Sequence, residues 1–358
     1  MEERKYIPFT EEMRKEYTIL VPNMLPRHFK IFLKIFESYG YKMELLETSG
    51  HRIIETGLKY VHNDTCYPAI LVIGQFIDAL NSGKYDPQKT ALILFQTGGG
   101  CRASNYIFLL RKALERAGYG YIPVISLNLS GLENHPGFKP TVSMIHRLFY
   151  GIIYGDLLLS LVNQCKPYEK NKGRTEQLAD ELTALLADKM QTEGVSFKKV
   201  KENCKMILSR FAEIPMEKTE KVKVGVVGEI YVKYSPLGNN NLEQFLIDEG
   251  AEVVVPGLLD FFMYCIVSNL SDIELYGLHK ARKPLLSFVF SYLKKQQNEI
   301  IEIIKNNSNF TPPTPIAHTM DLIRDFMGFG TKMGEGWLLP AEMLELNDEG
   351  VHNLVCTQ

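Results

Sequence analysis

The sequence contains little cysteine, little net charge and no long uninterrupted apolar run. Six cysteines in 358 residues are far too few for the disulfide framework of a small secreted domain. The formal net charge of −2 gives no general basic field, which argues against nucleic-acid binding. The first five residues are rich in charge and no apolar segment follows them, so the pattern of a signal peptide is absent. We therefore expect a cytoplasmic protein whose reduced cysteines are core side chains or ligands.

The most apolar stretch, residues 144–162, is interrupted by His146, Arg147 and Asp156. The apolar spacing between these residues is too short to cross a bilayer, so the pattern predicts a buried helix and no membrane association. Cys165 and Cys204 fall on predicted helices beside charged residues, and we expect both to be inert core thiols.

A chain of this length is too long for one compact core and indicates two lobes of roughly 150 residues each. Strands and helices alternate over residues 1–140, which predicts an open parallel sheet of flavodoxin-like type. In such sheets ligands bind beyond the carboxyl ends of the strands. The expected strands are residues 17–21, 41–47, 90–96 and 122–128, and the expected helices are residues 26–40, 50–59, 68–80 and 104–117.

Residues 141–221 have a helical pattern and predict an insert and linker between the lobes. Residues 222–358 predict a second α/β lobe of Rossmann-like type with three parallel strands, which we expect to be C-terminally truncated. Three strands are few for a sheet covered on both faces. The expected strands are 222–228, 251–255 and 351–355, the expected helices 242–250, 258–305 and 338–346, and the expected long loop 229–241.

Residues 92–104 carry the most informative local pattern. A short apolar strand is followed by three glycines and then by Cys101, shortly before a predicted helix. Glycines let the backbone turn sharply and approach a ligand closely. The positive end of the following helix favours a thiolate at Cys101 over a thiol.

Cys66 stands in a similar setting, in His-Asn-Asp-Thr-Cys-Tyr-Pro before a predicted helix. Neither Cys66 nor Cys101 belongs to a C-x-x-C pair, so zinc-ribbon spacing is absent. Soft thiolates without nearby histidine pairs suit iron–sulfur better than zinc. Cys356, at the end of a second-lobe strand, is a candidate third ligand, whereas Cys265 lies in an apolar helix and is more typical of a core. The alternative is that Cys66 and Cys101 are simply buried free cysteines.

The glycines of residues 98–103 also match the dinucleotide pattern G-x-G-x-x-A. The match does not follow the first strand of its lobe, and no acidic residue that would bind a ribose ends the next strand. A P-loop is excluded because no Gly-Lys-Ser/Thr follows. In the second lobe, Glu229, Tyr231 and Lys233 lie in a polar segment that would orient a substrate. The alternative is a structural turn in which Asn241 caps the next helix.

Several of these segments together resemble the dehydratase-like module of acyl-CoA dehydratase activase-related proteins. That module is similar to subunits of 2-hydroxyacyl-CoA dehydratases and benzoyl-CoA reductases, and to double-cubane cluster proteins. The match covers nearly the whole chain, and the two cysteine segments are its most specific parts. The segments are residues 7–10, 17–24, 63–68, 96–106, 123–128, 227–231 and 334–338.

The resemblance implies a two-lobed subunit that holds an iron–sulfur cluster, of [4Fe-4S] or double-cubane type, through three cysteines. By motif, Cys66 and Cys101 take two of the ligand positions. In the family the strand corresponding to residues 353–358 continues into Pro-Phe-Gly-Cys, whose cysteine is a third-ligand candidate beside Cys356 and Cys265. The resemblance also implies low-potential electrons from a separate ATP-dependent activator iron–sulfur protein, under anaerobic conditions, and an acyl-CoA substrate.

Three functions are compatible with these patterns. The first is a cluster-bearing electron-transfer protein or reductase or dehydratase component; in the related dehydratases, one electron added to the thioester carbonyl gives a ketyl that eases loss of a β-proton. The second is a nucleotide or acyl-CoA binding module without a cluster, and the third is a scaffold that docks an activator or a sister subunit. We expect a dimer, and the sequence assigns no catalytic residue.

Overall fold

The computed structural model describes residues 6–95, 105–127 and 133–357. The chain divides into two compact units, each described here by itself. Unit 1 comprises residues 1–148, 187–192 and 234–240, and unit 2 comprises residues 149–186, 193–233 and 241–358. Each unit contains one parallel sheet, so the predicted α/β class with two Rossmann-like lobes is confirmed.

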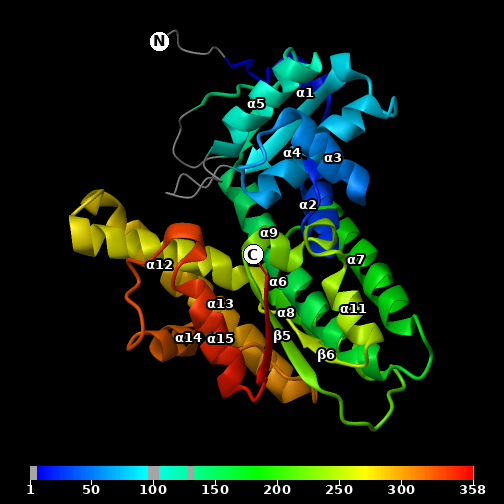
Figure 1. Ribbon diagram of the computed structural model, residues 1–358. Helices are drawn as coiled ribbons and strands as arrows, with labels where there is room; N and C mark the ends of the chain where they lie inside the picture. The colour runs from blue at the N-terminus through cyan, green and yellow to red at the C-terminus, as the bar shows by residue number, and fades with distance from the viewer. Residues whose placement is uncertain (1–5, 96–104, 128–132, 358) are drawn as a thin grey trace. The chain divides into compact units, whose positions relative to one another are not determined.

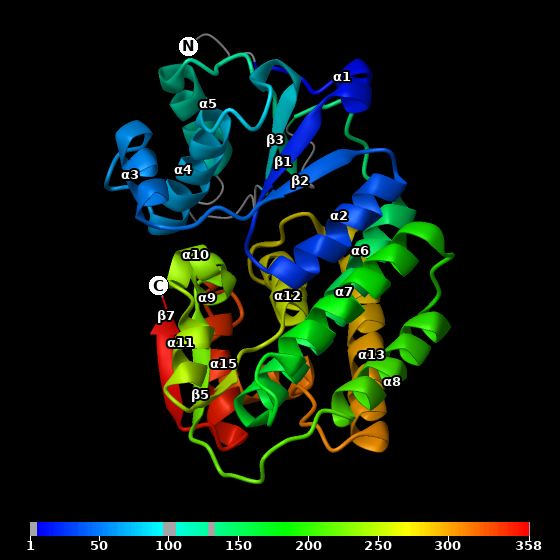
Figure 2. The ribbon, with the colours of Figure 1, turned by 90° about the vertical axis from the view of Figure 1, so that its right-hand side faces the viewer.

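The sheet of unit 1 has the strand order β2-β1-β3-β4, and all its pairs are parallel. Its strands are β1 (Thr18–Pro22), β2 (Lys42–Leu46), β3 (Thr90–Phe95) and β4 (Val124–Leu127). Because parallel crossovers are right-handed, the reversal of strand order at β1 places helices on both faces. Figures 1 and 2 show α2 on one side of the sheet and α3 to α5 on the other. This is the flavodoxin-like arrangement expected from the sequence.

Local signals explain where the helices of unit 1 begin and end. Pro26 stands in the first turn of α2, where its missing N–H costs nothing. Gly118 ends α5 in the left-handed conformation that glycine adopts most easily. The helices are α1 (Glu11–Glu16), α2 (Pro26–Ser38), α3 (His51–Tyr60), α4 (Tyr67–Asn81), α5 (Tyr106–Ala117) and α10 (Pro236–Asn239).

Helices α3 and α4 approach each other closely because two glycines face the contact. A Cβ at Gly74 would lie 2.2 Å from the carbonyl oxygen of Ile53, and one at Gly57 would lie 2.2 Å from that of Ile70. Every residue from Pro68 to Leu80 of α4 is buried, as expected for a helix whose side chains over this stretch are apolar except at Gln75 and Asp78. The position of α4, and of the cysteine that precedes it, therefore depends on these two glycines.

The sheet of unit 2 has the order β6-β5-β7, again parallel throughout. Its strands are β5 (Lys223–Gly228), β6 (Glu252–Val254) and β7 (Asn353–Thr357). Leu346 of α15 and Val351 pack against Val227 of β5. Gly225 permits this close contact, because a Cβ there would lie 2.7 Å from Leu346 Cδ1.

Helices make up most of the rest of unit 2. The first, α6, runs from unit 1 into unit 2 and contains the apolar stretch singled out in the sequence. In the described part of the chain it is the one helix whose length and composition would suffice to cross a membrane, and 67% of its apolar window is buried. The helices are α6 (Val142–Cys165), α7 (Arg174–Thr192), α8 (Phe197–Ala212), α9 (Ile230–Tyr234), α11 (Leu242–Asp248), α12 (Leu258–Tyr276), α13 (Lys283–Asn307), α14 (Ile316–Ile323) and α15 (Leu338–Asp348).

The expected loop over residues 229–241 is wrong, because the chain forms two short helices there. The Glu229 carboxylate accepts a hydrogen bond from the Val232 N–H, and the Ser235 hydroxyl accepts one from Gly238. Each of these side chains thus satisfies one N–H group in the first turn of its helix, α9 or α10, that has no partner within the helix. Asn241 does precede α11, but its side chain makes no capping bond.

We expect Gly74→Ala to lower the free energy of unfolding by about 1–3 kcal/mol, since the added methyl group meets backbone rather than a flexible side chain. Gly194→Ala is the matched control, because a Cβ at Gly194 meets nothing within 4 Å and should change stability by less than about 0.5 kcal/mol. Urea unfolding followed by circular dichroism measures both. Equal stability of the two variants would contradict the close contact between α3 and α4.

Candidate functional site

Cys66 lies directly before α4, where its backbone carbonyl accepts hydrogen bonds from Ala69 and Ile70. Its side chain is half-buried. The Cys66 Sγ atom lies 2.6 Å from the hydroxyl oxygen of Tyr106, the first residue of α5. The thiol is thus positioned by two helices and still partly accessible.

The contacts of α4 place Cys66 on the carboxyl side of the unit 1 sheet. Gln75, in the middle of α4, donates hydrogen bonds to the carbonyls of Leu46 (3.3 Å) and Thr48 (2.8 Å), where β2 ends. Cys66 precedes α4 and therefore lies beyond this edge. This agrees with the prediction for its loop. Cys101 and the glycine segment of residues 98–103 lie outside the described residues.

Cys356 lies within β7 of unit 2, opposite Val227 of β5 and near the carboxyl ends of both strands. Its side chain is exposed. The sequence placed it just after a strand of residues 351–355, whereas the strand is Asn353–Thr357 and includes it. An exposed thiol at a carboxyl edge is chemically suited to be a ligand.

The three remaining described cysteines are less suited to bind iron. Cys165 and Cys204 are both 0% exposed, and burial raises the pKa of each thiol to about 12. Burial, together with the nearby charge of Glu335, also raises the pKa of Cys265 to about 12. All three therefore remain protonated thiols at neutral pH, as expected for core side chains.

The carboxyl edge of β5 leads into a cluster of buried charged groups. Lys233 donates a hydrogen bond from Nζ to Glu342 Oε1 at 2.7 Å, and both side chains are almost fully buried. The N–H of Ile230 donates to Glu335 Oε1 at 2.7 Å, and the N–H of Glu229 donates to the carbonyl of Thr357 at 3.0 Å. Glu229 and Lys233, singled out in the sequence, are thus parts of a buried network.

Carboxyl groups outnumber cations in this part of the structure. Burial and the charge of Glu229 raise the pKa of Glu335 to about 8. The second carboxylate oxygens of Glu335 and Glu342 have no hydrogen-bond partner among the described residues. Burial also raises the pKa of Glu342, although Lys233 opposes the shift. These acids therefore keep protons to higher pH than exposed carboxyls do.

Unit 2 also contains a cavity of about 130 Å³, whose lining includes the carboxyl groups of Asp156, Glu252, Asp260, Glu345 and Glu349 and one cation, Lys223. Burial and the charge of Asp156 raise the pKa of Asp260 to about 7, and Gln297 donates a hydrogen bond to Asp260 at 2.7 Å. Burial and the charge of Asp260 raise the pKa of Glu345 in turn. Sequence reasoning missed these acids, although Asp260 is recognisable as a lone charge between Leu-Leu and Phe-Phe-Met.

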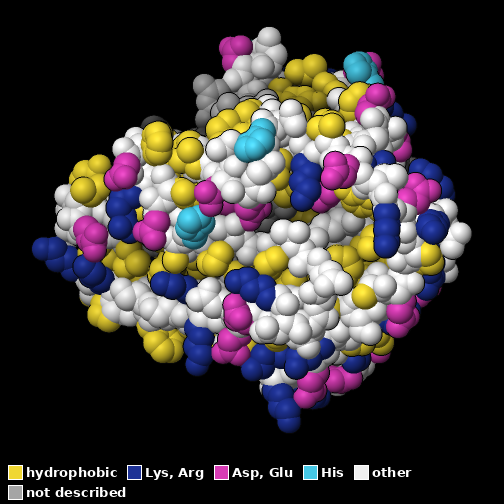
Figure 3. Space-filling view, turned by 90° about the horizontal axis from the view of Figure 1, so that it is seen from below, with side chains coloured by type: hydrophobic (Ala, Val, Ile, Leu, Met, Phe, Trp, Pro, Cys, Tyr) yellow, Lys and Arg dark blue, Asp and Glu magenta, His cyan; other side chains and the backbone are white. Residues whose placement is uncertain are grey.

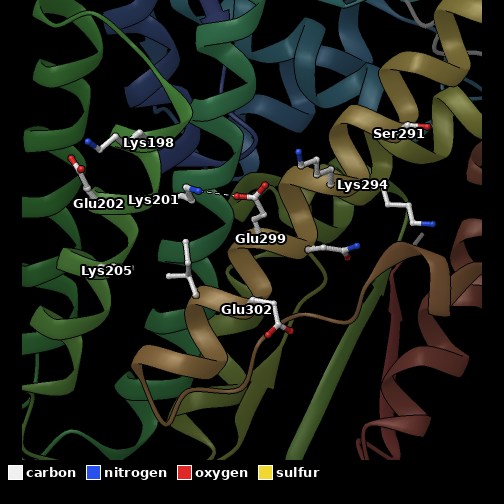
Figure 4. Close-up of a pocket in the computed structure, with 11 residues that line it drawn as sticks. Lys198, Lys201, Glu202, Lys205, Ser291, Lys294, Glu299 and Glu302 are labelled. Atoms are coloured by element: carbon white, nitrogen blue, oxygen red, sulfur yellow. Dashed lines mark hydrogen bonds and ion pairs between the residues drawn. The ribbon is translucent and has the colours of Figure 1, made fainter.

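A larger groove of about 850 Å³ lies between α8 and α13. Figure 4 shows Lys198, Lys201 and Glu202 of α8 facing Lys294 and Glu299 of α13, with an ion pair of 2.9 Å between Lys201 and Glu299. The described residues that line it include neither cysteine nor histidine. Mixed charge of this kind is typical of a solvated seam between helices.

Among the described residues, no three His, Cys, Asp or Glu side chains are grouped so that they could hold a metal ion. In comparisons with known proteins, no family model, curated protein or solved structure matches the chain. The resemblance argued from the motifs therefore remains a prediction, and the function has to be argued from the residues themselves.

The buried acids predict that unit 2 loses stability as pH rises. Asp260 binds its proton up to about pH 7 when folded, but the same carboxyl in the unfolded chain loses it near pH 4. Unfolding therefore releases protons between these values, and the free energy of unfolding falls as pH increases. We expect a decrease of about 1–3 kcal/mol between pH 5 and 8, at about 1.4 kcal/mol per unit of pKa shift.

Urea unfolding followed by Trp337 fluorescence measures this effect, because Trp337 is the single tryptophan and is fully buried in unit 2. Asp260→Asn should flatten the dependence on pH, and the exposed Glu302→Gln should leave it unchanged. A stability that rises over this pH range would show that these carboxyls are ionised in the folded protein.

Proposed function

We propose that the chain is an iron–sulfur protein that resembles the subunits of 2-hydroxyacyl-CoA dehydratases. It would act in low-potential electron transfer, or in reductive or dehydratase chemistry, with a separate ATP-dependent activator. The observation that carries the proposal is the position of Cys66, a half-buried thiol beyond the carboxyl edge of a flavodoxin-like sheet, 2.6 Å from Tyr106. Cys101, the second proposed ligand, stands five positions before Tyr106 in the sequence.

The residues present suit the thiolate ligation of such a cluster. Cys66 is accessible and is positioned by α4, and Cys356 is exposed at the end of β7. Cys265 is less suited, because its thiol pKa of about 12 disfavours the thiolate. We therefore retain Cys66, Cys101 and Cys356 as the proposed ligands. A cluster bound there would supply one-electron transfer and a Lewis acid for a thioester carbonyl.

Each residue has a separate task in this proposal. Cys66 would hold iron through Sγ, and the hydroxyl of Tyr106 would donate a hydrogen bond to the same sulfur. Hydrogen bonds to ligand sulfurs raise the reduction potential of a cluster. Glycines 57 and 74 fix α4 against α3 and so hold the position of Cys66.

Anaerobic purification and reconstitution with iron and sulfide should yield a brown protein with stoichiometric iron and acid-labile sulfide. Cys66→Ser and Cys101→Ser should each lower the iron content at least severalfold, because serine is a poor ligand for iron–sulfur clusters. Cys204→Ser is the matched control and should retain iron, since Cys204 is a fully buried thiol.

A colourless protein without iron would refute the proposal. Calorimetry with nucleotides and with CoA thioesters then distinguishes the alternatives. Tight binding that persists in Cys66→Ser and Cys101→Ser would favour a binding module without a cluster, and no binding would favour a docking scaffold.

Tyr106→Phe tests the contribution of the hydroxyl group. We expect unchanged iron content and a lower midpoint potential, by on the order of tens of millivolts, because a hydrogen bond to sulfur is lost. A redox titration followed by electron paramagnetic resonance measures the potential. An unchanged potential would show that Tyr106 does not contact a ligand sulfur in the loaded protein.

A further inference from the structure

The hairpin formed by α12 and α13 is unusually exposed for its composition. Helix α12 ends at Tyr276, Gly277 turns the chain in the left-handed conformation, and α13 begins at Lys283. Every residue from 274 to 285 is exposed. The side chains of Leu275, Tyr276 and Leu278 keep 60%, 66% and 51% of their surface accessible.

The start of α13 is apolar on all sides. Residues 284–293 read Pro-Leu-Leu-Ser-Phe-Val-Phe-Ser-Tyr-Leu and contain no charged side chain. A helix that is hydrophobic all round is normally buried, yet Leu285 is 65% exposed and Phe288 is 69% exposed. Exposed apolar side chains gathered in this way indicate that another surface covers them.

Two further exposed side chains extend this surface. Phe326 is 74% exposed and Met333 is 63% exposed. Their loop lies against α12, since a Cβ at Gly330 would come within 2.6 Å of Leu275 Cδ1 and Lys332 forms an ion pair with Asp272. The hairpin patch, as we call it, consists of Leu275, Tyr276, Leu278, Leu285, Phe288, Phe326 and Met333.

The area of the hairpin patch corresponds to a protein interface. With about 150–250 Å² for an aromatic side chain, the exposed fractions amount to on the order of 800 Å². The largest apolar patch on a typical monomer is about 300–600 Å², and each partner of a standard interface buries about 800 Å². In Figure 3 hydrophobic side chains lie among charged ones at the left end, where Figure 1 draws the end of α12.

The charges beside the patch have both signs. Lys280 and Arg282 are exposed at the hairpin tip. Beside Phe326, the exposed Asp321 forms an ion pair of 2.9 Å with the exposed Arg324, and Asp325 is exposed as well. An anionic lipid surface would favour basic residues alone, whereas a surface with both signs can be complementary to itself. In a two-fold dimer the basic hairpin tip of one copy can face Asp325 of the other.

We propose that the hairpin patch is a homodimer interface, occupied by the same patch of a second copy of this chain. Phe288 and Tyr276 are its expected anchors, because exposed aromatic side chains at the centre of an interface contribute most to binding. The inference concerns unit 2 alone and does not depend on cluster binding.

Analytical ultracentrifugation of the full chain as purified tests this interface. A reducing agent must be present, because Cys356 is exposed and could form an intermolecular disulfide. We expect a dimer at micromolar concentration, and at least tenfold weaker dimerisation for Phe288→Lys and for Tyr276→Lys. Phe245→Lys is the matched control: Phe245 is 58% exposed on α11, outside the patch, and this variant should dimerise like the unmodified chain.

Trp337 fluorescence checks that each variant is folded. A monomeric unmodified chain would overturn the proposal, as would a dimer that survives both patch substitutions. Phosphatidylserine vesicles are the second probe. A monomer that binds these vesicles through Phe288 would likewise overturn the proposal and identify the patch as a lipid-binding surface.

Discussion

Parallel pairing of the strands is the constraint on which the candidate site depends. Parallel strands all leave the sheet at the same edge, so segments distant in sequence are brought together there. In unit 1 this edge lies near Cys66 and the start of α5, which carries Tyr106. In unit 2 the parallel pairing of β5 and β7 brings Glu229 next to Thr357 and places Cys356 opposite Val227. Cys66 and Cys356 are therefore at positions where this class of fold binds its ligands.

The buried acids of unit 2 differ in how they are satisfied. Asp156 accepts hydrogen bonds from the first N–H groups of α12, at Leu258 (2.8 Å) and Leu259 (2.9 Å), so its charge is stabilised by the helix end. Burial and that same charge raise the pKa of Asp260, the residue that follows Leu259. The charge of one carboxylate thus raises the pKa of another, as happens when acids share a site with few cations.

The strands and most helices could be predicted because their apolar periodicity, prolines and glycines act locally. The helical turns after β5 could not, since the Glu229 side chain caps α9, whereas the sequence pattern fits a substrate-orienting loop and a structural turn equally well. The buried acids were also missed, because their low exposure follows from tertiary packing rather than from neighbours in sequence. Cys66 was placed correctly at a helix start, whereas its contact with Tyr106 joins residues that are 40 positions apart.

The backbone of Glu335 has a consequence for the stability of unit 2. Glu335 has a φ of +67°, between Gly334 and Gly336, whose φ values are also positive. A glycine there would relieve backbone strain, and losing the carboxyl would remove a buried acid. A screen for thermostable variants with glycine or asparagine at this position measures whether this gain outweighs the loss of the acceptor that Glu335 Oε1 provides for the Ile230 N–H.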